Sequence, residues 1–437
     1  MKRMVCLSLL LAGALILPAP VLADDDKVTI TGEAFARTEY LDDFDDFDSN
    51  AGRSWDFSTY RIRIGLDFEL TDNIDAFAQV QAHGLWGDSE FRASGDPAGG
   101  AVGQAPFDND SLLLYQAYVN LNDLADGPVS LRIGRQEHVL GNELHLGDNS
   151  FYNGQFFDGV RAMIDLEKTD LDIFFYNVEE RDITADFGGV PGSNDTKLGG
   201  VTANFEVAED QKIEPYVLYY HDGSPAGPAS YELYTVGALY MRPADDDRKF
   251  DWSVEAAFQK GDVNDPSACP GGTPCDLKSS IFEGWFGYSW GDDSRHRVHV
   301  GALAIGDGDD PVDAEFFMSI APDTHRRAGA MDLFTEGPGT SFLGTDSFHN
   351  LTTYNVGYAF TGERHGVSAT YHDFTLTEDF GAPADELGQE IDVIYNFKLK
   401  EKVGFELGVA QFMPDDVFVA PADDDPFRVW AMMKIGK

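Results

Sequence analysis

Apolar and polar residues alternate with a period of two along most of this 437-residue chain. This alternation is typical of strands that have one apolar and one polar face. About eighteen such segments follow residue 23. The first three run from about 28 to 40, 55 to 70 and 73 to 87, and the last three from about 387 to 400, 402 to 412 and 426 to 436. The pattern therefore predicts an all-β protein.

The connections between these segments alternate between long and short. Long ones fall at 88–111, 141–156, 182–195 and 307–349, and short ones at 123–128, Lys168, 209–211 and Gly362–Arg364. Strands that run up and down through a bilayer sort their connections in this way, with short periplasmic turns and long extracellular loops. We therefore predict a transmembrane antiparallel up-and-down β-barrel of about 18 strands.

The N-terminus has the features of a secretory signal. Lys2 and Arg3 precede an apolar run over 4–16, which is followed by the small-residue pattern Val21-Leu22-Ala23. This order predicts a signal peptide over 1–23 and a single barrel domain over 24–437. The expected location is the outer membrane of a Gram-negative bacterium. No later stretch of eighteen apolar residues exists, so an inner-membrane helical protein is excluded.

The alternation also predicts which charged side chains face the lumen. Arg61 and Arg63 alternate with apolar Ile62 and Ile64, and an arginine facing the bilayer midplane costs about 2–4 kcal/mol. The same argument places seven arginines inside the barrel: Arg61, Arg63, Arg132, Arg161, Arg295, Arg297 and Arg428. The planar guanidinium of arginine binds carboxylates through two N–H donors at once. A series of arginines along the lumen can therefore guide an acidic sugar polymer. The alternative is that these arginines only pair with neighbouring carboxylates across strands and stabilise the barrel.

The formal net charge of -45 leaves no positive field to attract nucleic acid, which is excluded as a partner. Much of the acidity lies in the expected loops, where it forms a solvated surface or holds divalent cations alongside lipopolysaccharide. Asp307, Asp309, Asp310 and Asp313 cluster around a glycine turn. Because calcium prefers oxygen ligands of this kind, calcium is the one cofactor that the sequence suggests.

Two cysteines remain after the signal is removed, Cys269 and Cys275 in Cys-Pro-Gly-Gly-Thr-Pro-Cys. An even pair around a Pro/Gly turn in an exported protein predicts a local disulfide in one long loop. No further zinc ligands are evident nearby, so a zinc site is not expected.

One stretch of the sequence resembles a known family. Residues 131–137 read Leu-Arg-Ile-Gly-Arg-Gln-Glu, and residues 156–161 read Phe-Phe-Asp-Gly-Val-Arg. This run resembles the alginate-export outer-membrane proteins, and the likeness extends from about residue 55 to the end. The resemblance implies an eighteen-stranded barrel that passes an anionic uronic-acid polymer through an arginine-rich constriction, to which Arg135 and Arg161 would contribute. It also implies contact with the outer-membrane assembly machinery and with periplasmic export partners.

Catalytic motifs are missing from the sequence: there is no Gly-x-Ser-x-Gly, His-Glu-x-x-His or Cys-x-x-Cys, so no enzyme is predicted. The expected function is passive passage of an alginate-like anionic polysaccharide across the outer membrane, with membrane lipid as the other partner. A general or cation-preferring porin for small solutes is the first alternative, and the acidic balance favours it. A secreted β-rich carbohydrate-binding or hydrolytic protein is a more distant one.

Overall fold

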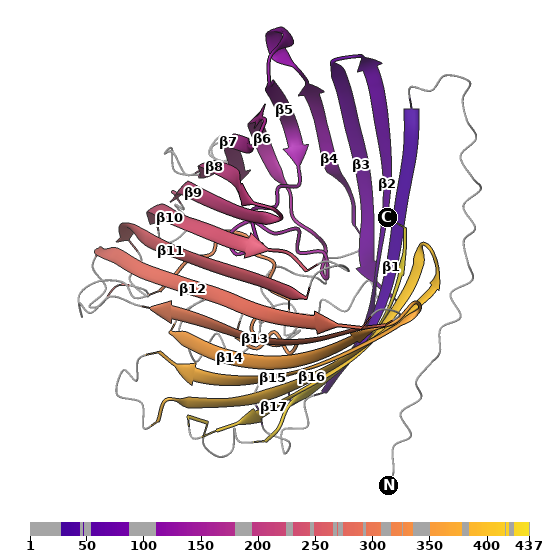
Figure 1. Cartoon of the computed structure of the whole chain (residues 1–437), viewed down its shortest axis with the longest axis vertical. Coiled ribbons are helices and arrows are strands. Elements are labelled where there is room, and N and C mark those ends of the chain that lie inside the picture. The colour runs from indigo at the N-terminus through magenta and orange to yellow at the C-terminus, as the bar shows by residue number, and fades with distance from the viewer. Residues whose placement is uncertain are drawn as a thin grey trace, which may run out of the picture.

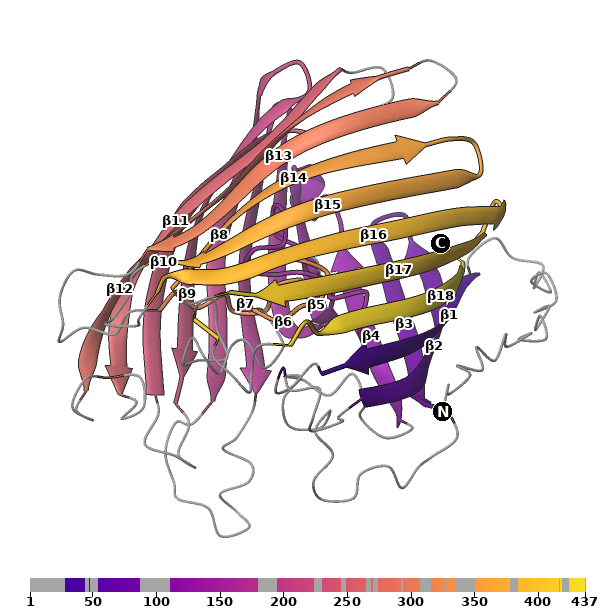
Figure 2. The same ribbon diagram turned by 90° about the horizontal axis from the view of Figure 1, so that it is seen from below.

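The computed structural model shows a closed, all-antiparallel β-barrel (Figures 1 and 2). It describes residues 28–43, 47, 54–86, 111–179, 195–223, 230–244, 249–264, 269, 274–291, 294–306, 316–325, 327–334, 350–377, 384–415, 417–418 and 424–436. The predicted signal peptide therefore lies outside the described residues.

Eighteen strands form one sheet. They are β1 (Val28–Asp42), β2 (Ser54–Thr71), β3 (Ile74–Leu85), β4 (Ser111–Leu121), β5 (Val129–Gln136), β6 (Phe157–Leu166), β7 (Thr169–Glu179), β8 (Thr196–Ala208), β9 (Gln211–Asp222), β10 (Ser230–Arg242), β11 (Phe250–Asn264), β12 (Cys275–Trp290), β13 (Arg295–Gly306), β14 (Leu351–Thr361), β15 (His365–Leu376), β16 (Glu386–Lys400), β17 (Val403–Pro414) and β18 (Phe427–Ile435). A short 3-10 helix, η1 (Leu124–Asp126), lies in the turn between β4 and β5.

Each strand pairs with its neighbours in sequence, and β1 pairs with β18 to close the sheet. Closure leaves no strand edge with unpaired backbone groups, as a lipid environment requires. The turns after the even-numbered strands have two to seven residues, whereas the connections after the odd-numbered strands have seven to 44. Both the strand count and this alternation confirm the sequence-based prediction.

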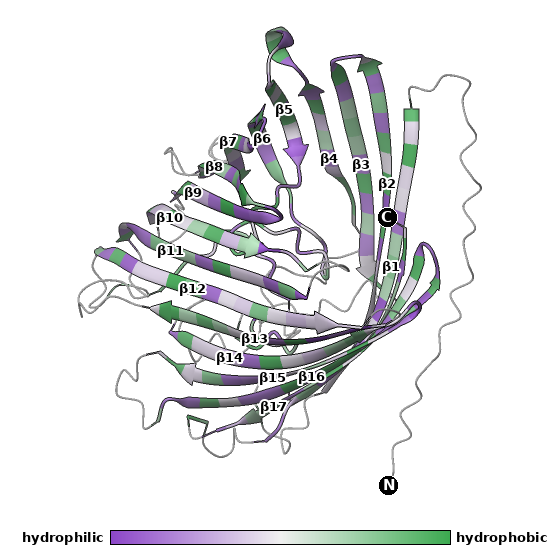
Figure 3. Ribbon diagram, in the orientation of Figure 1, coloured by the Kyte–Doolittle hydropathy of each residue, from purple (hydrophilic) through white to green (hydrophobic). Residues whose placement is uncertain are grey.

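The two faces of the strands differ as the alternation predicted. In β2, Ile62 and Ile64 are 38% and 42% exposed on the outer face, whereas Arg61 and Arg63 are each 6% exposed on the inner face. Figure 3 shows the same alternation of hydrophobic and hydrophilic bands along many strands. An apolar exterior around a charged interior is the arrangement of a transmembrane barrel. It argues against the alternative of a secreted soluble protein.

Among the described residues, no helix combines the length and the apolar character needed to cross a membrane.

Candidate functional site

Two long connections fold into the barrel and pack against each other. We call them the interior loops: residues 137–156, between β5 and β6, and the described residues 316–334, between β13 and β14. Leu146 and Ala321 form a parallel bridge. The N–H of Gly147 donates to the carbonyl of Ala321, and the N–H of Ala321 donates to the carbonyl of His145, both at 2.8 Å. These backbone bonds make one body of two segments that are far apart in sequence.

The interior loops contact inward-facing side chains on opposite sides of the barrel. Tyr152 and Ser150 offer their carbonyls to Arg61 on β2 at 2.8 and 3.1 Å. Met318, in the other loop, exchanges two hydrogen bonds with Gln259 on β11, at 2.8 and 3.0 Å. Because β2 and β11 lie far apart in the strand order, the joined loops must cross the lumen (Figure 1). They therefore fill part of the bore.

Two glycines let the loops approach charged wall residues closely. Gly154 has a φ of +82°, and a Cβ there would lie 2.2 Å from Arg63 Nη2. Gly329 has a φ of +83°, and a Cβ there would lie 2.5 Å from both carboxylate oxygens of Glu390 on β16. Only glycine adopts such a backbone readily and leaves that space free. These two glycines therefore determine where each interior loop contacts the barrel wall.

One sector of the wall, from β18 through β1 to β6, carries a series of inward-facing arginines. We call this series the arginine wall. It consists of Arg37, Arg61, Arg63, Arg132, Arg161 and Arg428. Arg132 and Arg161 lie directly opposite each other in the β5–β6 ladder. Each binds a wall side chain: Arg132 Nε donates to Asn120 Oδ1 at 2.8 Å, and Arg161 Nε donates to Asp172 Oδ2 at 2.6 Å.

Arg61 and Arg63 share contacts with β1 and the interior loops. Arg63 Nη1 lies 3.2 Å from both Glu33 Oε1 and Glu137 Oε1, and its guanidinium lies 3.7 Å from the ring centroid of Tyr115. Arg61 Nη2 lies 3.5 Å from the same Glu33 oxygen. A guanidinium with several partners is held in one position, which a channel needs if fixed charges are to face the solute.

A second buried network joins the arginine wall to the loop 316–334. Arg428 Nη1 donates to Asp332 Oδ2 at 2.7 Å, and Tyr152 donates to the same oxygen at 2.6 Å. His325 Nδ1 lies 2.7 Å from that oxygen as well. Burial alone would raise the pKa of Asp332, but His325 and Arg428 hold it well below its ordinary value. Asp332 therefore stays ionised and anchors the loop.

Beside the interior loops lies a cavity of about 630 Å³. Its lining combines loop residues with the inner faces of β12 to β16, and includes Glu283, Trp285, Arg297, His299, Asp323, Arg327, His372 and Asp392. Arg297 is held by Asp251 on β11, with Nη2 2.6 Å from Oδ1, and Arg327 is paired with Glu283. A polar solute in the cavity can therefore contact guanidinium groups, carboxylates and an aromatic ring.

A family model whose description is alginate export matches residues 27–431. The chain belongs to the alginate export family. No curated protein matches this family member in sequence.

Solved structures with a similar fold include those of the bacterial proteins OccK9, OccAB1 and OpdL. The structure of OccK9 (OpdG) from Pseudomonas aeruginosa is 13% identical with a TM-score of 0.58, and the match covers 93% of this chain and 98% of that one. For OccAB1 from Acinetobacter baumannii the identity is 11%, the TM-score is 0.58 and the coverage is 93% and 96%. For Pseudomonas aeruginosa OpdL the values are 10%, 0.57, 95% and 99%. At these identities the likeness shows that the alginate export family barrel shares the fold of these outer-membrane proteins.

Most of the arginines predicted to line the lumen of this family member do face inward. The exception is Arg135, whose position is corrected by the structure. It lies on the face of β5 that carries exposed Ile133, opposite to the face of Arg132. There Arg135 Nη2 pairs with Asp158 at 2.7 Å. Because side chains alternate across a strand, Arg135 cannot join Arg132 and Arg161 in the lumen.

On β13, Arg295 and Arg297 occupy inward positions that alternate with exposed Val298 and Val300 on the outer face. Arg295 begins the strand beside the short turn, whereas Arg297 reaches the cavity. The structure also joins Cys269 and Cys275 in a disulfide, next to the start of β12.

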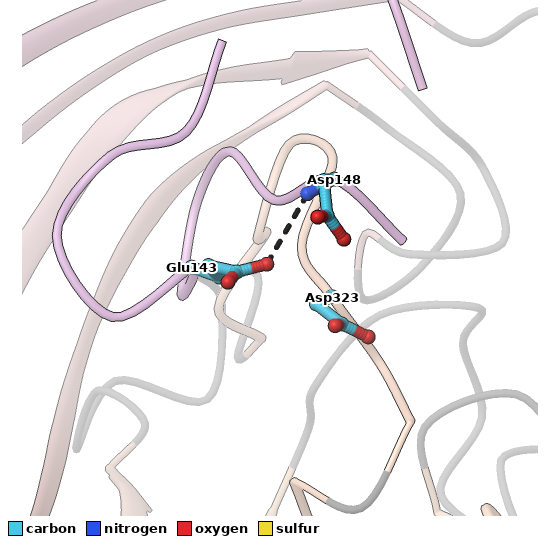
Figure 4. A group of neighbouring side chains, drawn as sticks. All are labelled: Glu143, Asp148 and Asp323. Carbon is cyan, nitrogen blue, oxygen red and sulfur yellow. Dashed lines mark hydrogen bonds between the residues drawn. The ribbon is translucent and has the colours of Figure 1, made fainter. Parts of the chain in front are cut away.

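The interior loops also bring three carboxylates together. Glu143, Asp148 and Asp323 each place an oxygen within 4.8 Å of the others (Figure 4). Burial raises the pKa of Asp323 to about 6 and also raises the pKa of Glu143. The calcium hypothesis from the sequence concerns Asp307, Asp309, Asp310 and Asp313, all of which lie outside the described residues.

Two arginines inside the barrel were not predicted from the sequence. Arg37 is 2% exposed and pairs with Glu39 at 2.5 Å. On β1 apolar Phe35 and Leu41 point inward with it, so the alternation that marked β2 is weak there. Arg327 lies in a loop, where no period exists to predict its direction. The only signal for either residue was its charge.

Proposed function

We propose that this protein is a passive outer-membrane channel for carboxylate-bearing polysaccharides of the alginate type. The observation that carries the proposal is the arginine wall, a series of six inward-facing guanidinium groups on one continuous sector of the barrel, of which Arg132 and Arg161 are partly exposed. Membership of the alginate export family supports the same substrate class. Planar guanidinium forks match the geometry of uronate carboxylates.

The ion pairs along this wall set the strength of solute binding. Arg161 is already paired with Asp172, and Arg63 with Glu33 and Glu137. A uronate carboxylate that arrives at Arg161 competes with Asp172 for the guanidinium, and the Arg161–Asp172 pair forms again when the sugar moves on. Binding of this kind is weak enough for release, as conduction requires. The net direction then follows from the gradient or from the machinery that delivers the polymer.

The cavity beside the interior loops provides a second group of contacts. Its Trp285 lies under Arg297, with the guanidinium 5.0 Å from the ring centroid. An aromatic face and a cationic fork side by side suit a sugar ring that carries a carboxylate.

The acidic residues of the same cavity favour a second candidate function. Glu143, Glu283, Asp323 and Asp392 line it together with Arg297 and Arg327. This excess of carboxylates would favour cations if the cavity, rather than the arginine wall, determines selectivity. In that case the protein is a cation-preferring porin for small solutes.

Reversal potentials across planar bilayers separate the two functions. For a uronate channel, the refolded barrel prefers anions and alginate oligomers block its current at micromolar to millimolar concentration. The double variant R132Q/R161Q, on the arginine wall, should lose most of the anion preference and block. The matched control is R135Q, which removes the same kind of charge from the outer face and should change neither. Cation preference without block in the unmodified protein would establish the small-solute porin instead.

A further inference from the structure

The same arrangement of a histidine and a tyrosine occurs twice on neighbouring strands. Across β13 and β14, His296 Nδ1 lies 2.7 Å from the Tyr358 hydroxyl. Across β15 and β16, His365 Nδ1 lies 2.7 Å from the Tyr395 hydroxyl. In each case a phenylalanine two residues after the tyrosine is the direct ladder partner of the histidine. The four strands lie side by side (Figure 2), and we call the two arrangements the His–Tyr pairs.

Both histidines lie on the outer face, at the short-turn end of their strands. His296 is two residues before Val298 on β13, and His365 is two residues before Val367 on β15. These valines are 41% and 39% exposed. Because alternate residues of a strand share a face, each histidine is the outward residue that immediately precedes the apolar band. The short turns are periplasmic in such barrels, so the His–Tyr pairs are level with the headgroups of the periplasmic leaflet.

The bond to tyrosine determines which nitrogen of each imidazole carries the proton. A phenolic hydroxyl that donates to Nδ1 leaves the proton of the neutral ring on Nε2. Aromatic neighbours hold the rings in position: Trp290 stacks on His296 at a centroid distance of 5.4 Å and an interplanar angle of 12°, and Phe397 contacts His365 at 5.1 Å. Each pair therefore presents one oriented N–H donor at the depth of the headgroups.

The short turns of this sector are more basic than those of the opposite sector. Residues 362–364 and 398–402 carry four cations, Arg364, Lys398, Lys400 and Lys402, against two carboxylates. The turns at 122–128, 165–169 and 208–211 carry six carboxylates against one lysine. Basic side chains at a membrane surface attract anionic headgroups. Among these turns, those beside the His–Tyr pairs are therefore the ones that favour an anionic lipid.

We propose that the His–Tyr pairs bind the phosphates of anionic phospholipids in the periplasmic leaflet. The Nε2–H of each histidine donates to a phosphate oxygen, and the acyl chains lie on the apolar band that begins at Val298 and Val367. Arg364, exposed in the turn next to His365, adds a positive charge beside the second pair. Because a hydrogen bond to a charged group is stronger than one between neutral groups, each donor contributes about tenfold to the affinity.

The test uses the full barrel in a neutral detergent and diacyl phosphatidylglycerol as the probe, with bound lipid counted by native mass spectrometry. The variant H296F/H365F keeps the aromatic packing and removes both donors, so each site should bind about tenfold more weakly. In H296Q/H365Q the side-chain amide supplies an N–H again, and most of the affinity should return.

The matched control is H221F. His221 shares the outer face of β9 with Val217, which is 49% exposed, but it lies at the long-loop end of that strand. This variant should bind phosphatidylglycerol as the unmodified protein does. Heat-modifiable gel mobility verifies that each variant is a folded barrel.

A diacylglycerol with the same acyl chains lacks the phosphate and should bind the unmodified protein about as weakly as phosphatidylglycerol binds H296F/H365F. The proposal is overturned if H296F/H365F and the unmodified protein bind phosphatidylglycerol equally well. Equal binding of diacylglycerol and phosphatidylglycerol to the unmodified protein would overturn it too, because the phosphate would then make no contribution.

Discussion

Arg428 on the last strand and Glu39 on the first are joined side chain to side chain where β18 pairs with β1. Arg428 Nε and Nη2 both donate to Glu39 Oε2, at 2.9 and 2.5 Å. The two residues are 4% and 1% exposed. The seam where β1 pairs with β18 thus contains a buried ion pair between residues from opposite ends of the chain.

Removal of one member of this pair should weaken the barrel. The variant R428M takes one cation from Glu39, which keeps Arg37, and one from Asp332, which keeps His325. Removal of one partner of a buried ion pair typically costs about 3–5 kcal/mol. Urea unfolding of the protein in lipid vesicles, followed by tryptophan fluorescence, measures the loss. The control R135M breaks a half-exposed pair and should cost about 1 kcal/mol or less. Similar unfolding midpoints for the two variants would show that the closure does not depend on Arg428.

Gly329 should be intolerant of a side chain. A Cβ there would lie 2.5 Å from the Glu390 carboxylate, and a left-handed backbone costs an L-residue about 1–2 kcal/mol. In G329A the loop should move away from β16, where the Met331 N–H now donates to Glu390 Oε1 at 2.8 Å. Single-channel recordings should show a larger and noisier conductance. Gly366, whose nearest Cβ contact would be 3.5 Å, provides the control G366A. Identical traces for both variants would contradict a fixed loop position.

The contact between the interior loops should depend on pH. Burial raises the pKa of Asp323 from 3.8 to about 6, so its stabilising contribution is present at low pH and is lost as the pH rises through about 6. Above that pH the ionised Asp323 repels Glu143 and Asp148, with Arg327 as the nearby cation. In chelator-containing buffer, conductance should therefore rise between pH 5 and pH 7.5. The variant D323N should remove this dependence, and an unchanged pH profile in D323N would assign it to another group.

The ion preference of the channel should depend on salt. The screening length is about 10 Å at 0.1 M salt and about 3 Å at 1 M, so the field of the arginine wall reaches into the lumen only at the lower concentration. If the wall selects for anions, the anion-to-cation permeability ratio should be greater at 0.1 M than at 1 M. Reversal potentials at both concentrations, corrected for ion activity, measure it. A ratio independent of salt would mean that solutes touch the arginines directly or do not pass them.

The barrel and the faces of its strands could be predicted from the sequence because lipid imposes a strict rule on every strand. Because a charge in the bilayer is costly, Arg61 can be assigned to the inner face and Ile62 to the outer face from residue type alone. Arg135 shows that the family resemblance is a less reliable guide to side-chain direction than the alternation. Its assignment to the lumen came from a family motif, whereas simple alternation from Arg132 places it on the outer face, where the structure has it.

The interior loops could not be predicted in the same way. Residues 137–156 and 316–334 have no period, and their positions depend on backbone carbonyls and on glycine conformations that composition does not reveal. Tyr152, for example, contributes its carbonyl to Arg61 and its hydroxyl to Asp332. Neither role follows from the residue type. The part of the lumen that the interior loops occupy is thus the part that sequence periodicity describes least.

The bonds from Arg61 to Tyr152 and from Gln259 to Met318 attach the joined loops to β2 and β11. A chain of hydrogen bonds thus runs across the diameter of the barrel. When the surrounding bilayer becomes thicker or compresses the barrel laterally, the cross-section can flatten only if these bonds stretch or slide. The interior loops therefore brace the barrel, and the width of the route beside them should change little with the mechanical state of the membrane.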